Sequence, residues 1–298
     1  MMLGACSRCY DRVARHEHLE LLERWTVRLA LIAFMLHLGA IAVHRVFPEL
    51  PILPRIVGTN FFAAIHTPFG FILFYEVILL VMMVPRSLTL SMGKQYEILS
   101  LIYIRGVFKD ISMIENTHLG WDDMEVLIPI FYDMSGGLLM FVLVALYYRL
   151  SGARNQPETI YPSLQRFIAL KKTLSLLLFA TLVVLATTNL WNAWSQQMLL
   201  PVAQIQAGHF PKTNFYEHFF TAMVFADIFL LVVSFLYSDN YELIFRNAGF
   251  VTSTVLIRFS FVADKPLDLL FALVAIVFGL LVLAIYQHFR RRLTMEAN

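Results

Sequence analysis

Two arginines, Arg105 and Arg258, stand in the middle of apolar runs, where a charged side chain is unexpected. The apolar run before each of them carries an acid, Glu76 in one case and Asp227 in the other. A charge at the centre of a membrane-spanning helix costs about 2.5–3.5 kcal/mol on insertion scales, so it normally faces the protein interior and has a partner. The helical rise brings each acid near the depth of the following arginine. We therefore expect the ion pairs Glu76–Arg105 and Asp227–Arg258.

Two interpretations of these pairs remain open. In one, the pairs fix the register of neighbouring helices, and the occurrence of a pair in each half favours this use. In the other, the same groups line a route for an ion or a proton. The acids Glu76 and Asp227 would then be pathway acids, with Arg105 and Arg258 as paired or gating charges.

Asp133 is a further acid in an apolar run, within the segment FYDMSGG. The small residues Ser135, Gly136 and Gly137 follow it, and they allow either close approach of a neighbouring helix or local unwinding. Backbone that unwinds inside a membrane lines a cavity. We therefore expect Asp133 to be a pathway acid as well.

An acidic segment lies just before the run that contains Asp133. Its carboxylates would concentrate cations at an outer mouth, and we expect them to form an outer funnel. The alternative is a solvated amphipathic loop on the membrane interface, anchored by Trp121. The expected funnel residues are Glu115, Asp122, Asp123 and Glu125.

Histidines raise the question of a haem or a metal. His37 and His44 share one helix face and His66 opens the next run, so His44 and His66 could face each other as haem ligands. No cysteine or carboxylate set completes a metal site with them, so these three are weak candidates and no cofactor is expected. Cys6 and Cys9 form a single CxxC motif, without the further ligands that a zinc site needs.

The composition explains why the charges stand out. The chain has 298 residues, of which 59% are hydrophobic and 15% charged, whereas soluble domains are about a quarter charged. The mean hydropathy is +0.68 and the net charge is only +2, which indicates a polytopic membrane protein and no nucleic-acid partner. The sequence contains no Gly-rich phosphate loop, no HExxH motif and no nucleophile triad, so we do not expect a conventional hydrolase or an NTP-driven pump.

Eight runs can hold transmembrane helices, which need about 20 mostly apolar residues. Two of them, Gln95–Ile111 and Ala248–Val262, contain the arginines and are ambiguous. If neither spans, the chain has six transmembrane helices, and this alternative remains open. The six clear runs are Trp25–Val46, Asn60–Val84, Leu127–Leu150, Phe167–Trp194, Phe215–Tyr237 and Leu267–Phe289.

The basic residues favour eight helices, because the clusters then fall on one side of the membrane. They lie before the first run, around the middle of the chain and at its end, and they predict cytoplasmic termini in a plasma membrane or a bacterial inner membrane. The main members are Arg8, Arg12, Arg15, Arg24, Arg149, Arg154, Arg166, Lys171, Lys172 and Arg290 to Arg292.

The two halves also resemble each other. Pro48 and Pro201, the segments TNF at 59–61 and 213–215, and the two arginines recur at one nearly constant spacing. A duplicated unit of four helices has both copies in the same orientation. We expect an all-α membrane protein of two parallel four-helix repeats, with a cytoplasmic segment at 1–24, repeats at 25–150 and 167–298, and a linker at 151–166.

The leading functional expectation is a conduit for a cation or proton, either channel-like or a secondary transporter. The alternative is a non-catalytic scaffold or assembly subunit of a larger membrane complex, and a haem-binding redox subunit comes third. The expected partners are the lipid bilayer, the small cation or proton, and either other membrane subunits or further copies of this chain.

Overall fold

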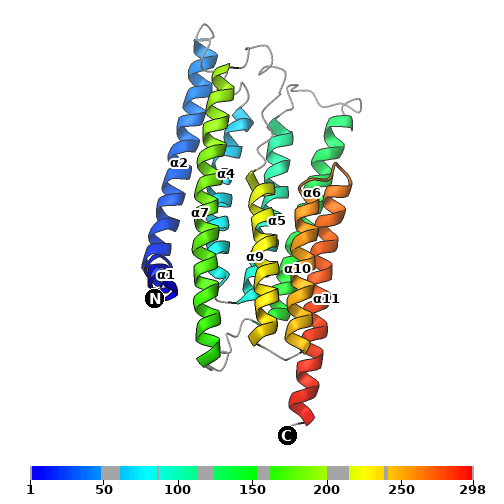
Figure 1. Ribbon diagram of the computed structural model, residues 1–298. Helices are drawn as coiled ribbons and strands as arrows, with labels where there is room; N and C mark the ends of the chain where they lie inside the picture. The colour runs from blue at the N-terminus through cyan, green and yellow to red at the C-terminus, as the bar shows by residue number, and fades with distance from the viewer. Residues whose placement is uncertain are drawn as a thin grey trace.

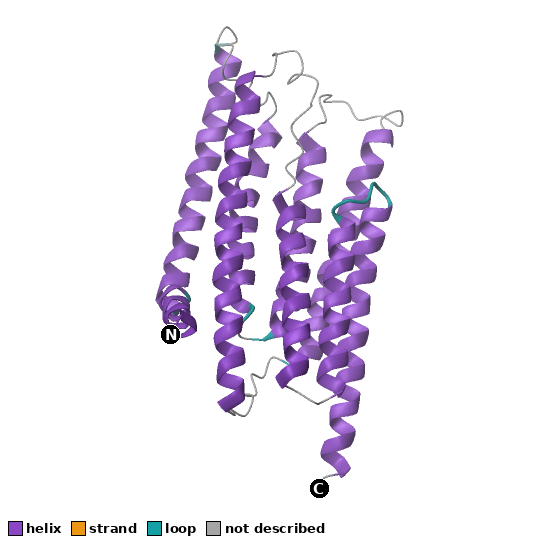
Figure 2. Ribbon diagram, viewed as in Figure 1, coloured by secondary structure: helices purple, strands orange, loops and turns teal. Residues whose placement is uncertain are grey.

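A computed structural model describes residues 2–47, 61–85, 87–112, 124–152, 162–199, 215–237 and 241–296. Within these ranges the chain forms nine α-helices and one 3-10 helix, and no strand (Figure 2). The all-α class expected from the sequence is confirmed for this part of the chain.

The described part of the chain contains ten helical segments. In chain order they are α1 (Met2–Val13), α2 (His16–Val46), η1 (Phe61–Ile65), α4 (His66–Met83), α5 (Leu88–Ser112), α6 (Met124–Ser151), α7 (Pro162–Leu199), α9 (Phe215–Tyr237), α10 (Tyr241–Ser260) and α11 (Leu267–Glu296).

The long helices form one antiparallel bundle (Figure 1). In that view the chain runs up α2, down α4, up α5 and down α6, and then up α7, down α9, up α10 and down α11. Each of these helices packs against the next within its half, and α6 packs against α11, α5 against α10 and α4 against α7. The halves are therefore joined along several helices.

Five helices of the described chain are long and apolar enough to cross a membrane, which fits a membrane-embedded protein. The stretch Thr67–Met83 is also apolar and helical, but it is shorter. The two arginine-containing runs are helical in α5 and α10, although neither helix is among the five. The five segments are Glu17–Val46, Leu127–Ser151, Phe167–Asn192, Phe215–Phe235 and Leu267–Phe289.

Apolar side chains cover much of the outside of the bundle, while polar ones occur in its interior. Leu190 is 73% exposed and Leu36 is 69% exposed, whereas Gln95 and Thr254 are fully buried. A water-soluble domain rarely exposes large continuous apolar surfaces. This distribution therefore fits a protein surrounded by lipid.

The small residues after Asp133 serve close helix packing. Helix α6 continues without a break through Ser135, Gly136 and Gly137, so local unwinding does not occur there. A Cβ atom at Gly136 would lie 2.5 Å from Cδ1 of Leu269 in α11. The glycine therefore allows α11 to approach α6 closely.

The N-terminal helix α1 packs against the ends of two long helices. Its Tyr10 hydroxyl donates a hydrogen bond to the carbonyl oxygen of Met82, 2.5 Å away in α4. Its Asp11 accepts a bond of 2.6 Å from Nζ of Lys172 in α7. Helix α1 therefore links the first half of the bundle to the second.

Candidate functional site

The first group of interior charges, here called the lower cluster, consists of Glu76, Lys94 and Glu97. Nζ of Lys94 lies 2.6 Å from Oε2 of Glu76 and 2.5 Å from Oε2 of Glu97. Glu76 belongs to α4, and the other two belong to α5. The side chains of Lys94 and Glu76 are only 14% and 17% exposed, so the pair is largely shielded from solvent.

The expected pair Glu76–Arg105 is therefore wrong, because Lys94 is the partner of Glu76. Helix α4 ends at Met83 and α5 begins at Leu88, so Glu76 and Lys94 each lie about 10 Å from the connection between the two helices. Arg105 lies more than a further 15 Å up α5. It donates instead from Nη1 to the hydroxyl of Tyr216 in α9, at 3.3 Å.

A second group, the middle cluster, surrounds Asp227 of α9 with Gln95 of α5 and Thr254 of α10. Asp227 is 2% exposed, and both of its neighbours are fully buried. Its Oδ2 accepts a bond from Oγ1 of Thr254 at 3.1 Å and a longer one from Nε2 of Gln95 at 3.5 Å. Its Oδ1 has no hydrogen-bond partner among the described residues.

Asp227 takes part in none of the ion pairs formed within the described ranges, so the expected pair Asp227–Arg258 is also wrong. Arg258 bonds from Nη2 to Oε1 of Glu217 at 2.9 Å and from Nε to Oγ1 of Thr221 at 2.5 Å. Glu217, Thr221 and Arg258 form the upper cluster. Because α9 and α10 are antiparallel, Thr254 meets Asp227 and Arg258, one turn later in α10, meets residues earlier in α9.

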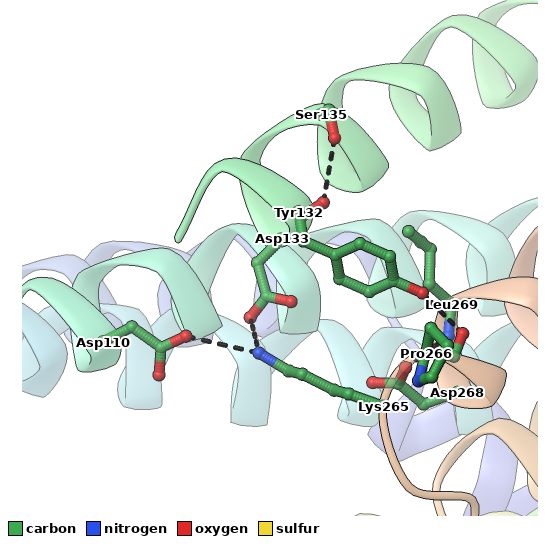
Figure 3. Close-up of polar contacts among 8 residues, drawn as sticks. All are labelled: Asp110, Tyr132, Asp133, Ser135, Lys265, Pro266, Asp268 and Leu269. Atoms are coloured by element: carbon green, nitrogen blue, oxygen red, sulfur yellow. Dashed lines mark hydrogen bonds and ion pairs between the residues drawn. The ribbon is translucent and has the colours of Figure 1, made fainter. Parts of the chain in front are cut away.

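The remaining acid, Asp133, lies beside the loop between α10 and α11 (Figure 3). Nζ of Lys265 in that loop lies 3.0 Å from Oδ2 of Asp133 in α6 and 3.3 Å from Oδ2 of Asp110 in α5. The adjacent Tyr132 hydroxyl donates to the carbonyl oxygen of Pro266 at 2.5 Å. The loop of the second half is thus fixed to two helices of the first.

The charge of Lys265 is maintained in this position. Burial lowers the pKa of its ammonium group, but the hydrogen bond to Asp133 and the charges of Asp110 and Asp133 outweigh burial, and the pKa is raised overall. Lys265 therefore remains protonated at neutral pH.

Most of the expected outer funnel falls outside the described ranges. This applies to Glu115, Asp122 and Asp123, while Glu125 lies in the first turn of α6. The funnel and the pathway roles of the interior acids stay predictions.

The histidines do not assemble a metal site in the described part of the chain. Nδ1 of His37 lies 2.6 Å from Oγ1 of Thr67, and Nδ1 of His44 is buried with no hydrogen-bond partner among the described residues. His66 is the first residue of α4. Cys9 is an exposed free thiol in α1, and no group of three or more His, Cys, Asp or Glu side chains that could hold a metal occurs among these residues. The haem alternative stays a prediction.

The three clusters and the contact between Asp133 and Lys265 place charged and hydrogen-bonding side chains inside the bundle of apolar helices. In comparisons with known proteins, no protein-family model, no curated protein and no solved structure matches the chain.

Several residues of the clusters are not identified by sequence reasoning. The sequence predicts Lys94 to be a charge at the membrane surface, although its spacing of three residues from Glu97 is typical of an ion pair within a helix. Gln95 and Thr254 carry no charge, so nothing distinguishes them from other polar residues in apolar runs. Glu217 lies two residues after a helix start, where an acid is commonly a helix-terminal residue.

Proposed function

We propose that the chain is an integral membrane protein that forms a conduit for a cation or a proton, either channel-like or as a secondary transporter. The observation that carries this proposal is the set of three clusters on α4, α5, α9 and α10. The lower and middle clusters share one level of α5, and the upper cluster lies one turn further along α10. Ionisable side chains inside a membrane protein commonly mark an ion or proton pathway, because each is costly to place there.

The clusters adjoin one another along the helices. Lys94 of the lower cluster and Gln95 of the middle cluster are consecutive residues of α5. Thr254 of the middle cluster and Arg258 of the upper cluster lie one helical turn apart in α10, about 6 Å along its axis. A charged species that moves between clusters would therefore take short steps within protein, without entering lipid.

In this proposal Glu76 and Asp227 are the central pathway acids, and Arg105 and Arg258 are the gating charges. Asp133 is a pathway acid at the upper rim, where its contact with Lys265 has to open for passage. The acids Glu115, Asp122, Asp123 and Glu125 form the outer funnel. This assignment follows the order of the groups along the antiparallel helices.

We further propose eight spans in two parallel four-helix repeats, with both termini in the cytoplasm and the protein in a plasma membrane or bacterial inner membrane. Two observations support this topology. The contacts between successive helices follow the same order in α2 to α6 as in α7 to α11. The helices α5 and α10, which carry Arg105 and Arg258, occupy the same place in that order.

A second candidate function is a scaffold or assembly subunit of a larger membrane complex. It is favoured by three ion pairs that join neighbouring elements: Glu76–Lys94, Glu217–Arg258 and Asp133–Lys265. In a scaffold these pairs would fix helix positions and conduct nothing. The exposed apolar helix faces would then carry the partner subunits.

Flux through purified protein in liposomes separates the two candidates. A conduit should dissipate an imposed proton or cation gradient, and Glu76→Gln should reduce the flux at least severalfold. The matched control is Glu20→Gln, which removes the same charge from a side chain that is 51% exposed. Absence of flux with every cation tested, together with a membrane partner that co-purifies in stoichiometric amount, would replace the conduit by the scaffold.

A further inference from the structure

The hydroxyl group of Thr254 lies at the centre of an unusual set of neighbours. Its Oγ1 lies 3.1 Å from Oδ2 of Asp227, 3.1 Å from Oε1 of Gln95, 3.2 Å from the carbonyl oxygen of Phe250 and 3.4 Å from Sδ of Met92. All four neighbours accept hydrogen bonds, but a threonine hydroxyl has only one hydrogen to donate. The side chains around Thr254 therefore offer more hydrogen-bond acceptors than donor hydrogens.

The carboxyl group of Asp227 has the same deficit. Its Oδ2 has a second donor only in Nε2 of Gln95, at the limiting distance of 3.5 Å, and its Oδ1 has none among the described residues. A buried carboxylate normally has a cation or several good donors, because an uncompensated charge is costly in a medium of low dielectric constant. Neither is present around Asp227 in the described ranges.

Three basic side chains on the helices around Asp227, those of Lys94, Lys172 and Arg258, have acidic partners elsewhere. Those helices are α5, α7 and α10. The acidic residue nearest to the middle cluster along the chain is Glu97, and its carboxylate is paired with Lys94. Among the described residues, the basic side chains of these helices form the ion pairs Lys94–Glu76, Lys94–Glu97, Lys172–Asp11 and Arg258–Glu217.

A proton on Asp227 removes the buried charge and adds the missing hydrogen-bond donor beside Thr254. With a hydrogen on Oδ2, the carboxyl group donates to Oγ1 of Thr254, and Thr254 donates onward to Oε1 of Gln95. Each group then has a donor and an acceptor at the observed distances, and no charge is buried. The amide of Gln95 can still donate weakly to the carboxyl group.

A metal cation suits this site less well. Hard cations such as Na⁺ are bound by oxygen ligands, whereas the thioether of Met92 is a soft ligand. Asp227, Gln95, Thr254 and Met92 are all 2% exposed or less. Oδ2 of Asp227, Oε1 of Gln95 and Oγ1 of Thr254 are already in hydrogen-bond contact with one another.

We propose that Asp227, Gln95 and Thr254 form a proton-binding site in which the carboxyl group of Asp227 carries the proton and donates it to Oγ1 of Thr254. This inference rests on the proposed function and names a proton as the transported species. On release the O–H bond of the carboxyl group breaks, its electron pair stays on the carboxylate, and water admitted to the conduit accepts the proton. Reloading reverses the step.

Infrared spectroscopy of the reconstituted full chain tests the site independently of transport. At neutral pH the wild-type protein should show a carboxylic acid C=O band that is lost in Asp227→Asn and unchanged in Asp11→Asn, which alters a side chain that is 56% exposed. In Thr254→Val the band should persist and shift to higher frequency, because its hydrogen bond is lost. Identical spectra for wild type and Asp227→Asn, or an unshifted band in Thr254→Val, would overturn the proposed site.

Transport measurements distinguish failure of this inference from failure of the proposed function. Liposomes under a potassium diffusion potential should take up protons, read by an enclosed pH dye, and Asp227→Asn should lose at least nine-tenths of that uptake. Uptake of radioactive Na⁺ that depends on Asp227 would overturn the proton assignment and leave the conduit standing. Absence of both fluxes would overturn the conduit and the transported proton with it, while the infrared result would still decide whether Asp227 holds a proton.

Discussion

Nη1 of Arg105 lies 3.3 Å from the hydroxyl oxygen of Tyr216, and the next residue of α9, Glu217, accepts a hydrogen bond from Arg258. The two arginines that recur in the sequence thus bind consecutive residues of one helix. Arg258 reaches α9 from within its own half, whereas Arg105 reaches it from the other half. Similar sequence positions therefore have different structural roles in the two halves.

Replacement of Arg258 by Gln should destabilise the protein, because it leaves Glu217 without its cation. An unsatisfied buried polar group costs about 1–3 kcal/mol, and the side chains here are 23% and 26% exposed, so we expect about 1–2 kcal/mol. Thermal unfolding in detergent measures the change. The control Arg24→Gln, in a pair with side chains 68% and 51% exposed, should have no measurable effect.

The double variant Arg258→Gln with Glu217→Gln provides the second check. It should be more stable than Arg258→Gln alone, because the remaining amides can bond to each other. Equal stability of the single and double variants would show that the ion pair does not hold α9 to α10.

Gly279→Ala should disrupt the packing of α11 against α5. A Cβ atom at this position would lie 1.7 Å from the hydroxyl oxygen of Tyr96, which is fully buried and bonded to Oγ of Ser253 at 2.7 Å. Overpacking of this kind costs about 1–3 kcal/mol. The matched variant Gly70→Ala meets no atom within 4 Å and should be neutral or slightly stabilising in the same unfolding assay.

The contact between Lys265 and Asp133 should tolerate exchange of its charges. Lys265→Asp alone places a carboxylate beside Asp133 and Asp110, and like charges at this distance repel. We expect a loss of about 1–3 kcal/mol and faster proteolysis of the α10–α11 loop. Adding Asp133→Lys should restore at least half of the lost stability, and no recovery would mean that the loop is fixed by Tyr132 and Pro266 instead.

Chemical labelling tests whether α5 crosses the membrane. In a chain with Cys6 and Cys9 replaced by serine, Ser112→Cys should react with an impermeant maleimide added outside intact cells. Ser87→Cys, before the other end of α5, should react only after permeabilisation. Reaction of both positions from the same side would exclude the eight-span arrangement and favour six spans.

The sequence predicts the helices better than the contacts between them. Apolar length predicts α6, α9 and α11 directly, since each buried or lipid-facing turn needs apolar residues. The arginines Arg105 and Arg258 do not prevent their runs from being helical, because a helix satisfies its own backbone hydrogen bonds.

The partners of the charged residues could not be predicted with the same success. The sequence does not show where one helix ends and the next begins, so the relative depth of Glu76 and Arg105 is uncertain by several turns. In the structure Lys94 is the partner of Glu76, and Arg258 bonds to Thr221. Arg105 lies more than about 15 Å further up α5 than Lys94. The neutral groups around Asp227 leave no charge pattern at all, so only the folded chain brings them together.

The connection between the halves has a consequence for biosynthesis. Gln95, Tyr96 and Asp133 belong to helices that leave the ribosome first, but they bond to Asp227, Ser253 and Lys265, which are synthesised later. During translation, polar side chains of the first four long helices therefore lack their native hydrogen-bond partners until α9 to α11 have been synthesised. We expect the insertion machinery to retain these early helices, away from bulk lipid, until the later ones arrive and the bundle closes.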